Sequence, residues 1–151
     1  SYDLRLIDTI SRKVAAGIPV KIIVSNPKSD ISTTEDYLAN PTATKTVVMK
    51  RLTKLLGSTR AAHDAACRSL TIAPLRVSAS ATWPNGKPPA LHGKVIAVDD
   101  AAFYIGSQNA YPNQLPEFGY IIEDATAMRD LNRLYLDPMV QYSSAAALPC
   151  G

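Results

Sequence analysis

One histidine and one lysine stand two positions apart in a nearly apolar run, LHGKVIAV at residues 91–98. Such a run predicts a strand, and on a strand the side chains of His92 and Lys94 point to the same face. Because the run is apolar on both faces, the strand is expected in the middle of a covered sheet. An imidazole and an ammonium there cost free energy of desolvation unless an anion meets them. The pair therefore indicates a site for an anionic group.

Further polar residues follow this pair at fixed offsets. Asp99 ends the first apolar run, and Gly106-Ser107-x-Asn109 ends the next one. Each residue alone has an ordinary structural explanation: a core histidine, a lysine whose stem covers apolar surface, a turn aspartate, a glycine at a bend. Six fixed types at these offsets are expected by chance in on the order of one in 10⁵ to 10⁶ chains of this length. The combination, rather than any single residue, carries the functional prediction.

This spacing, His-x-Lys, four residues, Asp, six residues, Gly-Ser-x-Asn, resembles the signature of the phospholipase D superfamily at every defining position. The flanks are similar to the C-terminal half of the secreted, Streptomyces-type bacterial phospholipases D. The similar segments cover nearly the whole chain and include VKIIVSNP (20–27), ATWPNGKPPALHGK (81–94), AFYIGSQNAYPNQLPEFGYIIED (102–124) and LDPMVQYS (136–143). Two departures stand out: Gly93 replaces a bulkier residue often seen there, and those enzymes carry two motifs where this chain carries one.

The resemblance implies cleavage of a phosphodiester through a covalent phosphohistidine. One neutral imidazole attacks phosphorus, and a second, protonated imidazole gives a proton to the leaving alcohol. Carried over to this sequence, Lys94 and Asn109 bind the phosphate, Ser107 is a supporting donor, and Asp99 is the motif's structural partner. A lysine and neutral donors suffice for this charge, so neither a metal nor another cofactor is required. The sequence also offers no cluster of His, Cys and carboxylate residues that predicts a metal site.

Two further roles follow from the same resemblance. The family orients each catalytic imidazole with an acidic residue downstream of the motif, and Glu117 stands at about that place. A surface carboxylate at the start of a strand is the alternative explanation for Glu117. The family assigns the nucleophile to the first motif, so His92, in the second, would be the general acid and later the base that activates water or an acceptor alcohol.

One motif supplies half of a two-histidine site. The other histidine, His63, lies in an Ala-rich helical stretch without a lysine or asparagine at motif spacing, which argues against catalysis. The second motif is therefore expected from an N-terminal half. The alternatives are a homodimeric endonuclease that pairs two copies of His92, and a non-catalytic interaction domain. Phosphatidylcholine as substrate is implied by resemblance, and four aromatic residues near the motif are candidates for a head-group pocket: Trp83, Tyr104, Tyr111 and Tyr120.

The two cysteines, Cys67 and Cys150, are predicted to form a disulfide, because a cysteine in a tail has little packing value unless it anchors that tail. Two unrelated buried thiols are the alternative. A disulfide implies an oxidising, extracellular destination, which agrees with the secreted relatives. The chain starts at Ser1 without a signal segment, as expected of a processed product or a fragment.

Composition and periodicity predict a single domain over residues 1–151. Apolar residues make up 46% and charged residues 19% of the chain, with a net charge of +3 that is too small to indicate nucleic acid by itself. No apolar stretch approaches the ~20 residues that span a bilayer. Interleaved elements predict an α/β fold, a mixed sheet flanked by helices. The expected helices are 3–16, 43–56 and 125–136, and the expected strands are 20–25, 69–77, 90–98, 102–106 and 118–123.

Overall fold

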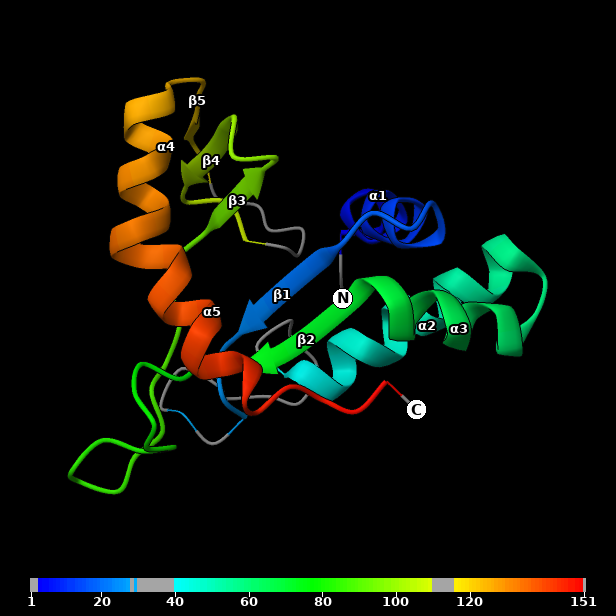
Figure 1. Cartoon of the computed structure of the whole chain (residues 1–151), viewed down its shortest axis with the longest axis horizontal. Coiled ribbons are helices and arrows are strands. Elements are labelled where there is room, and N and C mark those ends of the chain that lie inside the picture. Colours follow the sequence, from blue (N-terminus) through cyan, green and yellow to red (C-terminus); the bar gives the residue numbers. More distant parts are fainter. Residues whose placement is uncertain (1–2, 28, 30–39, 110–115, 151) are drawn as a thin grey trace.

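Helices and strands are interleaved along the chain, as the sequence predicted. A computed structural model describes residues 3–27, 29, 40–109 and 116–150 (Figure 1). The elements, in chain order, are α1 (Leu4–Ala15), β1 (Val20–Val24), α2 (Pro41–Leu56), α3 (Thr59–Ser69), β2 (Leu70–Pro74), β3 (Val95–Val98), β4 (Ala102–Gly106), β5 (Gly119–Ile122), α4 (Ala125–Leu131), a π-helical turn (Asn132–Leu136) and α5 (Asp137–Ser144).

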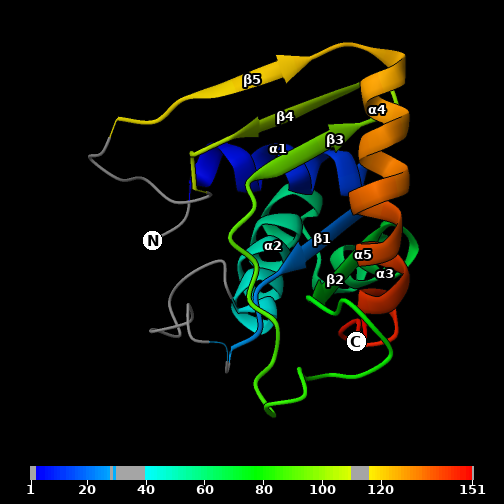
Figure 2. The same ribbon diagram turned by 90° about the vertical axis from the view of Figure 1, so that its left-hand side faces the viewer.

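The described strands form two sheets of different kinds. β1 and β2 pair in parallel, with Val20 opposite Leu70. β3, β4 and β5 form an antiparallel sheet in that order, with Val98 opposite Ala102. Figure 2 shows this second sheet above the parallel pair, with α4 running down beside it. Parallel and antiparallel pairing and flanking helices confirm the predicted α/β class.

The main core lies between the first three helices. Apolar residues at helical spacing meet there, and they are fully or almost fully buried: Ile7, Val14, Val48, Leu52, Ala62, Ala65 and Ala66. Each of these helices begins at a polar N-cap, namely Asp3, Asn40 and Ser58. Gly57 ends α2 with φ 69°, the left-handed conformation that glycine adopts most easily.

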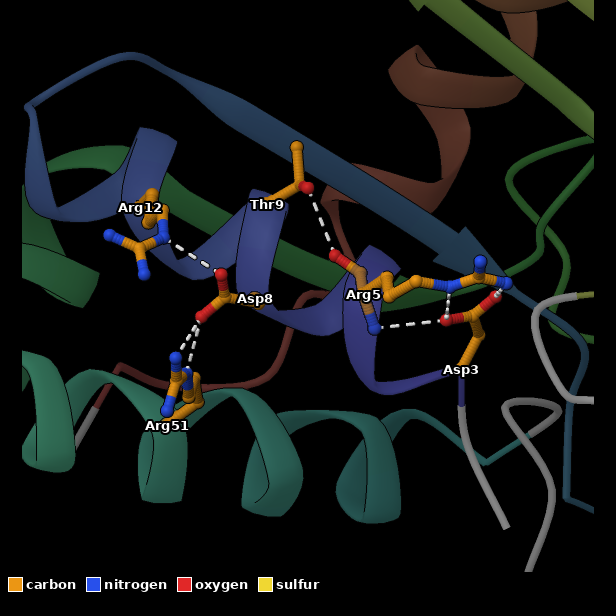
Figure 3. A network of polar contacts seen from close by, with 6 residues as sticks. All are labelled: Asp3, Arg5, Asp8, Thr9, Arg12 and Arg51. Atoms are coloured by element: carbon orange, nitrogen blue, oxygen red, sulfur yellow. Dashed lines mark hydrogen bonds and ion pairs between the residues drawn. The ribbon is translucent and has the colours of Figure 1, made fainter.

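A charged bridge joins α1 to α2 beside this core. The Asp8 carboxylate accepts hydrogen bonds from Arg12, one turn along α1, and from Arg51 on α2 (Figure 3). Arg12 and Arg51 hold the pKa of Asp8 below its ordinary value of 3.8. A carboxyl whose pKa is lower in the folded state stabilises the fold above its unfolded pKa, and the contribution is lost as the pH falls through the folded pKa.

Asp8→Asn is therefore expected to lower the melting temperature at neutral pH. The difference from wild type should shrink as the pH falls below 3.8, because the wild-type carboxyl then takes up a proton. Thermal unfolding followed by circular dichroism across pH measures both effects. Asp130→Asn is the matched control, because Asp130 pairs with Arg133 on the same helical segment, with no other ion pair among the described residues, and its side chain is 57% exposed. Equal effects of the two substitutions would contradict a bridging role for Asp8.

The antiparallel sheet departs from the sequence prediction. β3 begins at Val95, not at residue 90, and it is an edge strand in the described part of the chain. Its side chains are open to solvent: Ile96 is 49% and Val98 53% exposed. The prediction of a strand covered on both faces is therefore wrong for the chain by itself. The helices pack mainly on one another and on the parallel pair, which leaves much of this sheet without a covering layer (Figure 1).

The C-terminal part is held to the rest of the fold by a covalent bond. The helical stretch predicted for residues 125–136 is longer than expected, because the π-helical turn leads directly into α5. After α5, the chain returns to α3, where Cys150 forms the predicted disulfide with Cys67. No helix in the described ranges has the length and apolar character needed to cross a bilayer.

Candidate active site

Two polar residues at the end of β1 hold the segment that leads into the motif. The buried Ser25 accepts a hydrogen bond at its Oγ from the Leu91 amide at 2.7 Å. Asn26 donates from Nδ2 to two carbonyl oxygens, those of Leu75 and Pro89, both at 2.8 Å. These contacts join the parallel sheet to the segment just before His92. The position of the motif histidine therefore depends on a clamp more than 60 residues earlier in the chain.

His92 and Lys94 lie in that segment, before β3 starts. The His92 side chain is exposed and Lys94 is half-buried. The Lys94 ammonium donates to the His92 carbonyl oxygen at 2.8 Å, and the Gly106 amide donates to the Lys94 carbonyl oxygen at 3.2 Å. The second bond continues the β3–β4 pairing by one residue. The two halves of the motif thus meet at one end of the antiparallel sheet.

Ser107 and Glu117 complete this end of the sheet. The Ser107 hydroxyl donates to the Glu117 carboxylate. Ser107 also joins the ends of β4 and β5, since its amide donates to the Phe118 carbonyl oxygen at 2.8 Å and its Oγ accepts from the Phe118 amide at 3.0 Å. Glu117, for which the sequence allowed two explanations, therefore lies within the motif region and contacts a motif residue.

The charge balance of the site is set by Lys94 and Glu117. Partial burial lowers the pKa of Lys94, and the negative charge of Glu117 partly offsets this effect. The amine has lost some hydration while a carboxylate lies nearby. A phosphate group that bound here would supply further negative charge, and it would favour the ammonium form of Lys94.

Asp99 lies at the other end of β3. Asp99 and Asp100 form the tight turn into β4, with φ values of 52° and 53°, and the Ala101 amide closes it by donating to the Val98 carbonyl oxygen at 3.0 Å. Aspartate tolerates this left-handed conformation better than most residues. Asp99 stands five positions after Lys94 along the extended strand, which corresponds to about 16 Å. Its placement fits the structural role that the resemblance implied.

The remaining predicted residues are distributed as follows. Asn109 is half-buried and follows Ser107 by two positions. Trp83 lies in a loop and is 47% exposed, and Tyr120 is 65% exposed on β5, with its ring 6.4 Å from that of Phe118. Tyr111 lies outside the described residues. Of the four candidate pocket aromatics, Tyr104 has a packing role instead.

Tyr104 explains the glycine of the GS-x-N half of the motif. Gly106 lies opposite Gly119 in the β4–β5 register, and the Tyr104 side chain covers both glycines. A Cβ on Gly119 would overlap the Tyr104 ring. A Cβ on Gly106 would meet the Tyr104 hydroxyl and also backbone, with the Phe118 carbonyl oxygen at 2.5 Å. The motif glycine is thus required by the close approach of two strands.

Gly93 also has a steric explanation. A Cβ at this position would meet the hydroxyl of Tyr135 in the π-helical turn, whereas the nearest other atoms lie at 3.6 Å or more. Burial raises the pKa of Tyr135, so the phenol stays neutral. Tyr135 therefore occupies the space that the bulkier residue of related motifs would need.

Gly93→Ala is expected to cost about 1 kcal/mol of unfolding free energy, the low end of the overpacking penalty, because the position is exposed and only the Tyr135 hydroxyl has to move. Tyr135→Phe in the same chain should restore most of the loss, because only the hydroxyl oxygen is closer than 3.6 Å. Denaturant unfolding of the two single variants and the double variant measures the coupling between the positions. Additive effects in this cycle would contradict direct contact between Gly93 and Tyr135.

His63 lies far from this site, on α3, in agreement with the argument against a catalytic role. Its ring nitrogens lie 3.8 Å from the sulfur of Cys67. The potential ligand atoms of His63, Cys67 and Cys150 lie within 4.8 Å of one another, with the two sulfurs joined as a disulfide. The sequence shows no sign of this grouping, because the tail brings Cys150 next to α3 from 83 residues away.

Sequence reasoning missed Ser25, Asn26 and Tyr135. The first two do leave a signal, since they are polar residues directly after the apolar strand run VKIIV and before Pro27. Such residues at the end of a buried strand often hydrogen-bond neighbouring segments. Tyr135 leaves no comparable signal, because its contact with Gly93 depends on how a helix packs.

Comparison with known proteins agrees with the motif. No protein-family model matches the chain. The chain is 42% identical to Phospholipase D of Streptomyces antibioticus over 154 aligned residues, which cover 99% of this chain and 28% of that protein. The relationship predicted from the motif and its flanks is thereby confirmed. The chain spans little more than a quarter of the length of this relative.

Proposed function

The chain is related over nearly its whole length to a phospholipase D, and from this premise we propose that it forms the part of a phospholipase D-type phosphodiesterase that carries one of two motifs. The observation that supports this most is the junction of the two motif halves. Lys94, Ser107 and Glu117 gather at one end of the antiparallel sheet, directly after His92. A cation and a hydroxyl donor at one place, with an imidazole two residues before the cation, suit a phosphodiester.

The reaction is cleavage of the head-group ester of a phospholipid such as phosphatidylcholine, which yields phosphatidic acid. A histidine of the other motif attacks phosphorus, and protonated His92 gives its proton to the leaving alcohol. The phosphohistidine is then attacked by water, or by an acceptor alcohol in transphosphatidylation, with His92 as the base. Lys94, Ser107 and Asn109 hold the non-bridging oxygens, whose negative charge grows in the transition state.

Glu117 acts through its neighbours in this scheme. It accepts a hydrogen bond from Ser107, which holds this donor in place, and its negative charge favours the ammonium form of Lys94. It is also the carboxylate available to orient an imidazole and to stabilise its protonated form. Asp99 acts at a distance, through the turn that joins β3 to β4.

The other motif comes from a partner segment in this proposal. Apolar side chains on the antiparallel sheet support that view, with Tyr120 65% and Ile121 75% exposed on its edge strand. The small share of the relative that the chain covers also supports it. The disulfide supports secretion, because such bonds persist in oxidising compartments.

The test combines a mass measurement with two substrates. Native mass spectrometry gives the composition of the assembly. Activity assays then measure whether that assembly hydrolyses phosphatidylcholine in mixed micelles or cleaves duplex DNA. Activity on lipid by an assembly containing one copy of this chain and one other motif is the expected result. A homodimer active on DNA would favour the endonuclease alternative instead. A stable monomer that cleaves either substrate unaided would contradict both, since one imidazole would then perform the work assigned to two.

Lys94→Ala is expected to lower kcat/KM on the lipid by about 10²–10³-fold, the usual effect of removing one donor to a developing oxyanion. Asn109→Ala should lower it to a similar extent. The control is Lys50→Ala, which removes an exposed lysine from α2 and should leave turnover unchanged. Rates measured over a range of lipid concentrations separate binding from catalysis. Unchanged turnover in Lys94→Ala would remove this residue from the mechanism.

A further inference from the structure

A second group of reactive side chains lies on the far side of the molecule from the motif. His63 and Cys67 are four residues apart on α3, so their side chains stand one turn apart on the same helix face. Both ring nitrogens of His63 lie 3.8 Å from the Cys67 sulfur. With Cys150, the three potential ligand atoms all lie within 4.8 Å of one another. In both views α3 lies well away from β3 (Figures 1 and 2).

These distances match a tetrahedral metal site. Zinc binds imidazole nitrogen at about 2.0–2.1 Å and thiolate sulfur at about 2.3 Å, so two such ligands lie roughly 3.5–3.8 Å apart. His63 and Cys67 already have this separation. Only Cys150 is too close, because its sulfur is covalently bonded to that of Cys67. The site requires that this bond break and that the two sulfurs then move apart to roughly 3.8 Å, the separation of two thiolates on one tetrahedral zinc ion.

Two hydrogen bonds to β2 and α2 hold the tail in addition to the disulfide. The Leu148 amide donates to the Ile72 carbonyl oxygen at 2.8 Å. The Lys45 ammonium donates to the Pro149 carbonyl oxygen at 2.5 Å. Both contacts involve residues directly before Cys150. A reduced Cys150 thiol is therefore kept within reach of Cys67 and His63.

A carboxylate next to the histidine supports the same arrangement. The Asp64 carboxylate lies 3.6 Å from Nδ1 of His63. In many zinc sites, the nitrogen that does not bind metal interacts with such a carboxylate, which fixes the ring and increases its basicity. Nε2 of His63 is then the nitrogen that faces the metal. All three ligand residues are exposed, so an ion reaches them without rearrangement of the core.

We propose that reduction of the Cys67–Cys150 disulfide creates a site for a thiolate-preferring divalent cation, with Zn²⁺ as the probe. A dithiol supplies the two electrons: the protein S–S bond breaks, two cysteine thiols form, and the dithiol closes to its own disulfide. Zn²⁺ then binds two thiolates and one imidazole, two protons leave the thiols, and water takes the fourth position. The site replaces a covalent link between tail and helix by a metal link, and it is independent of the proposed catalytic function.

The experiment compares zinc binding by oxidised and reduced protein. The protein is reduced with a dithiol, freed of it by anaerobic gel filtration, and titrated with Zn²⁺ against a chromophoric chelator. Reduced wild type is expected to bind about one equivalent more than oxidised protein. His63→Ala should weaken this extra binding at least tenfold, whereas His92→Ala, which removes the other histidine, should not change it. Equal extra binding by reduced wild type and His63→Ala, or none by wild type, would overturn the proposal.

A second measurement covers loss of structure on reduction. Near-ultraviolet circular dichroism and thermal unfolding follow the reduced protein with and without Zn²⁺. Zinc is expected to raise the melting temperature of the reduced protein, or to restore the folded signal if reduction removes it. It should also protect both thiols from alkylation. If zinc changes neither the melting temperature nor the thiol alkylation of the reduced protein, the proposal is contradicted. This holds whether or not the reduced protein stays folded.

Discussion

His92→Ala is expected to lower turnover of phosphatidylcholine by about 10²–10⁴-fold, the contribution of a positioned general acid, in the assembly that contains the other motif. The fold should survive, because the His92 side chain is exposed and the segment around it is held through backbone atoms of Pro89 and Leu91. Circular dichroism and thermal unfolding check this. A variant that keeps near-wild-type turnover would remove the motif from the mechanism.

The leaving group of the substrate tests which role His92 has. A phosphatidyl ester of 4-nitrophenol needs no proton on its departing oxygen, so the first step should survive the substitution. The second step still needs the base that activates water. His92→Ala should therefore release a burst of about one nitrophenolate per site and then turn over slowly, the kinetic sign of a covalent intermediate that accumulates. Equal losses for both leaving groups, with no burst, would instead assign His92 as the nucleophile.

Loss of the disulfide is expected to have the largest effect on stability. The Cys67–Cys150 bond joins residues 83 positions apart, and the chain-entropy model gives about 4–5 kcal/mol for a loop of that length. Cys67→Ser with Cys150→Ser should lower the unfolding free energy by about this amount in urea. Each single substitution should cost nearly as much as the double one, since either one removes the same cross-link. A loss below about 1 kcal/mol would show that the entropic model fails here.

A count of free thiols belongs with that measurement. Wild-type protein should show two titratable thiols only after reduction, since no free cysteine is present among the described residues. Two thiols in the native, unreduced protein would mean that the cross-link is absent in solution. The argument for an oxidising compartment would then no longer hold.

Local patterns predicted most of the elements because the causes are local. The spacing of Ile7 and Val14 predicts α1, and Gly57 predicts the end of α2. The disulfide was predictable from the place of Cys150 in a tail. The motif predicted the gathering of Lys94 and Ser107, because the strand pairing that brings them together is encoded between them.

The errors arise where the cause is distant in the sequence. The apolar residues of β3 indicate that its faces are suited to burial, but they do not tell which element covers them. Burial was therefore predicted for Ile96 and Val98, which are exposed in this chain. The Ser25 clamp depends on a contact across 66 residues. The overlap of Gly93 with Tyr135 depends on the course of a π-helical turn that periodicity does not reveal. None of these contacts has a short-range signature.

The packing of the Tyr104 side chain on Gly106 and Gly119 limits which substitutions these three positions can accept during evolution. The nearest atoms to a new Cβ at residue 119 all belong to the Tyr104 side chain, so a larger residue there becomes tolerable once the ring is replaced. A larger residue at position 106 stays excluded even without the ring, because a Cβ there would lie 2.5 Å from the Phe118 carbonyl oxygen and 2.7 Å from the Gly119 Cα. Positions 104 and 119 are therefore expected to vary together among homologues, while position 106 remains glycine whatever occupies the other two.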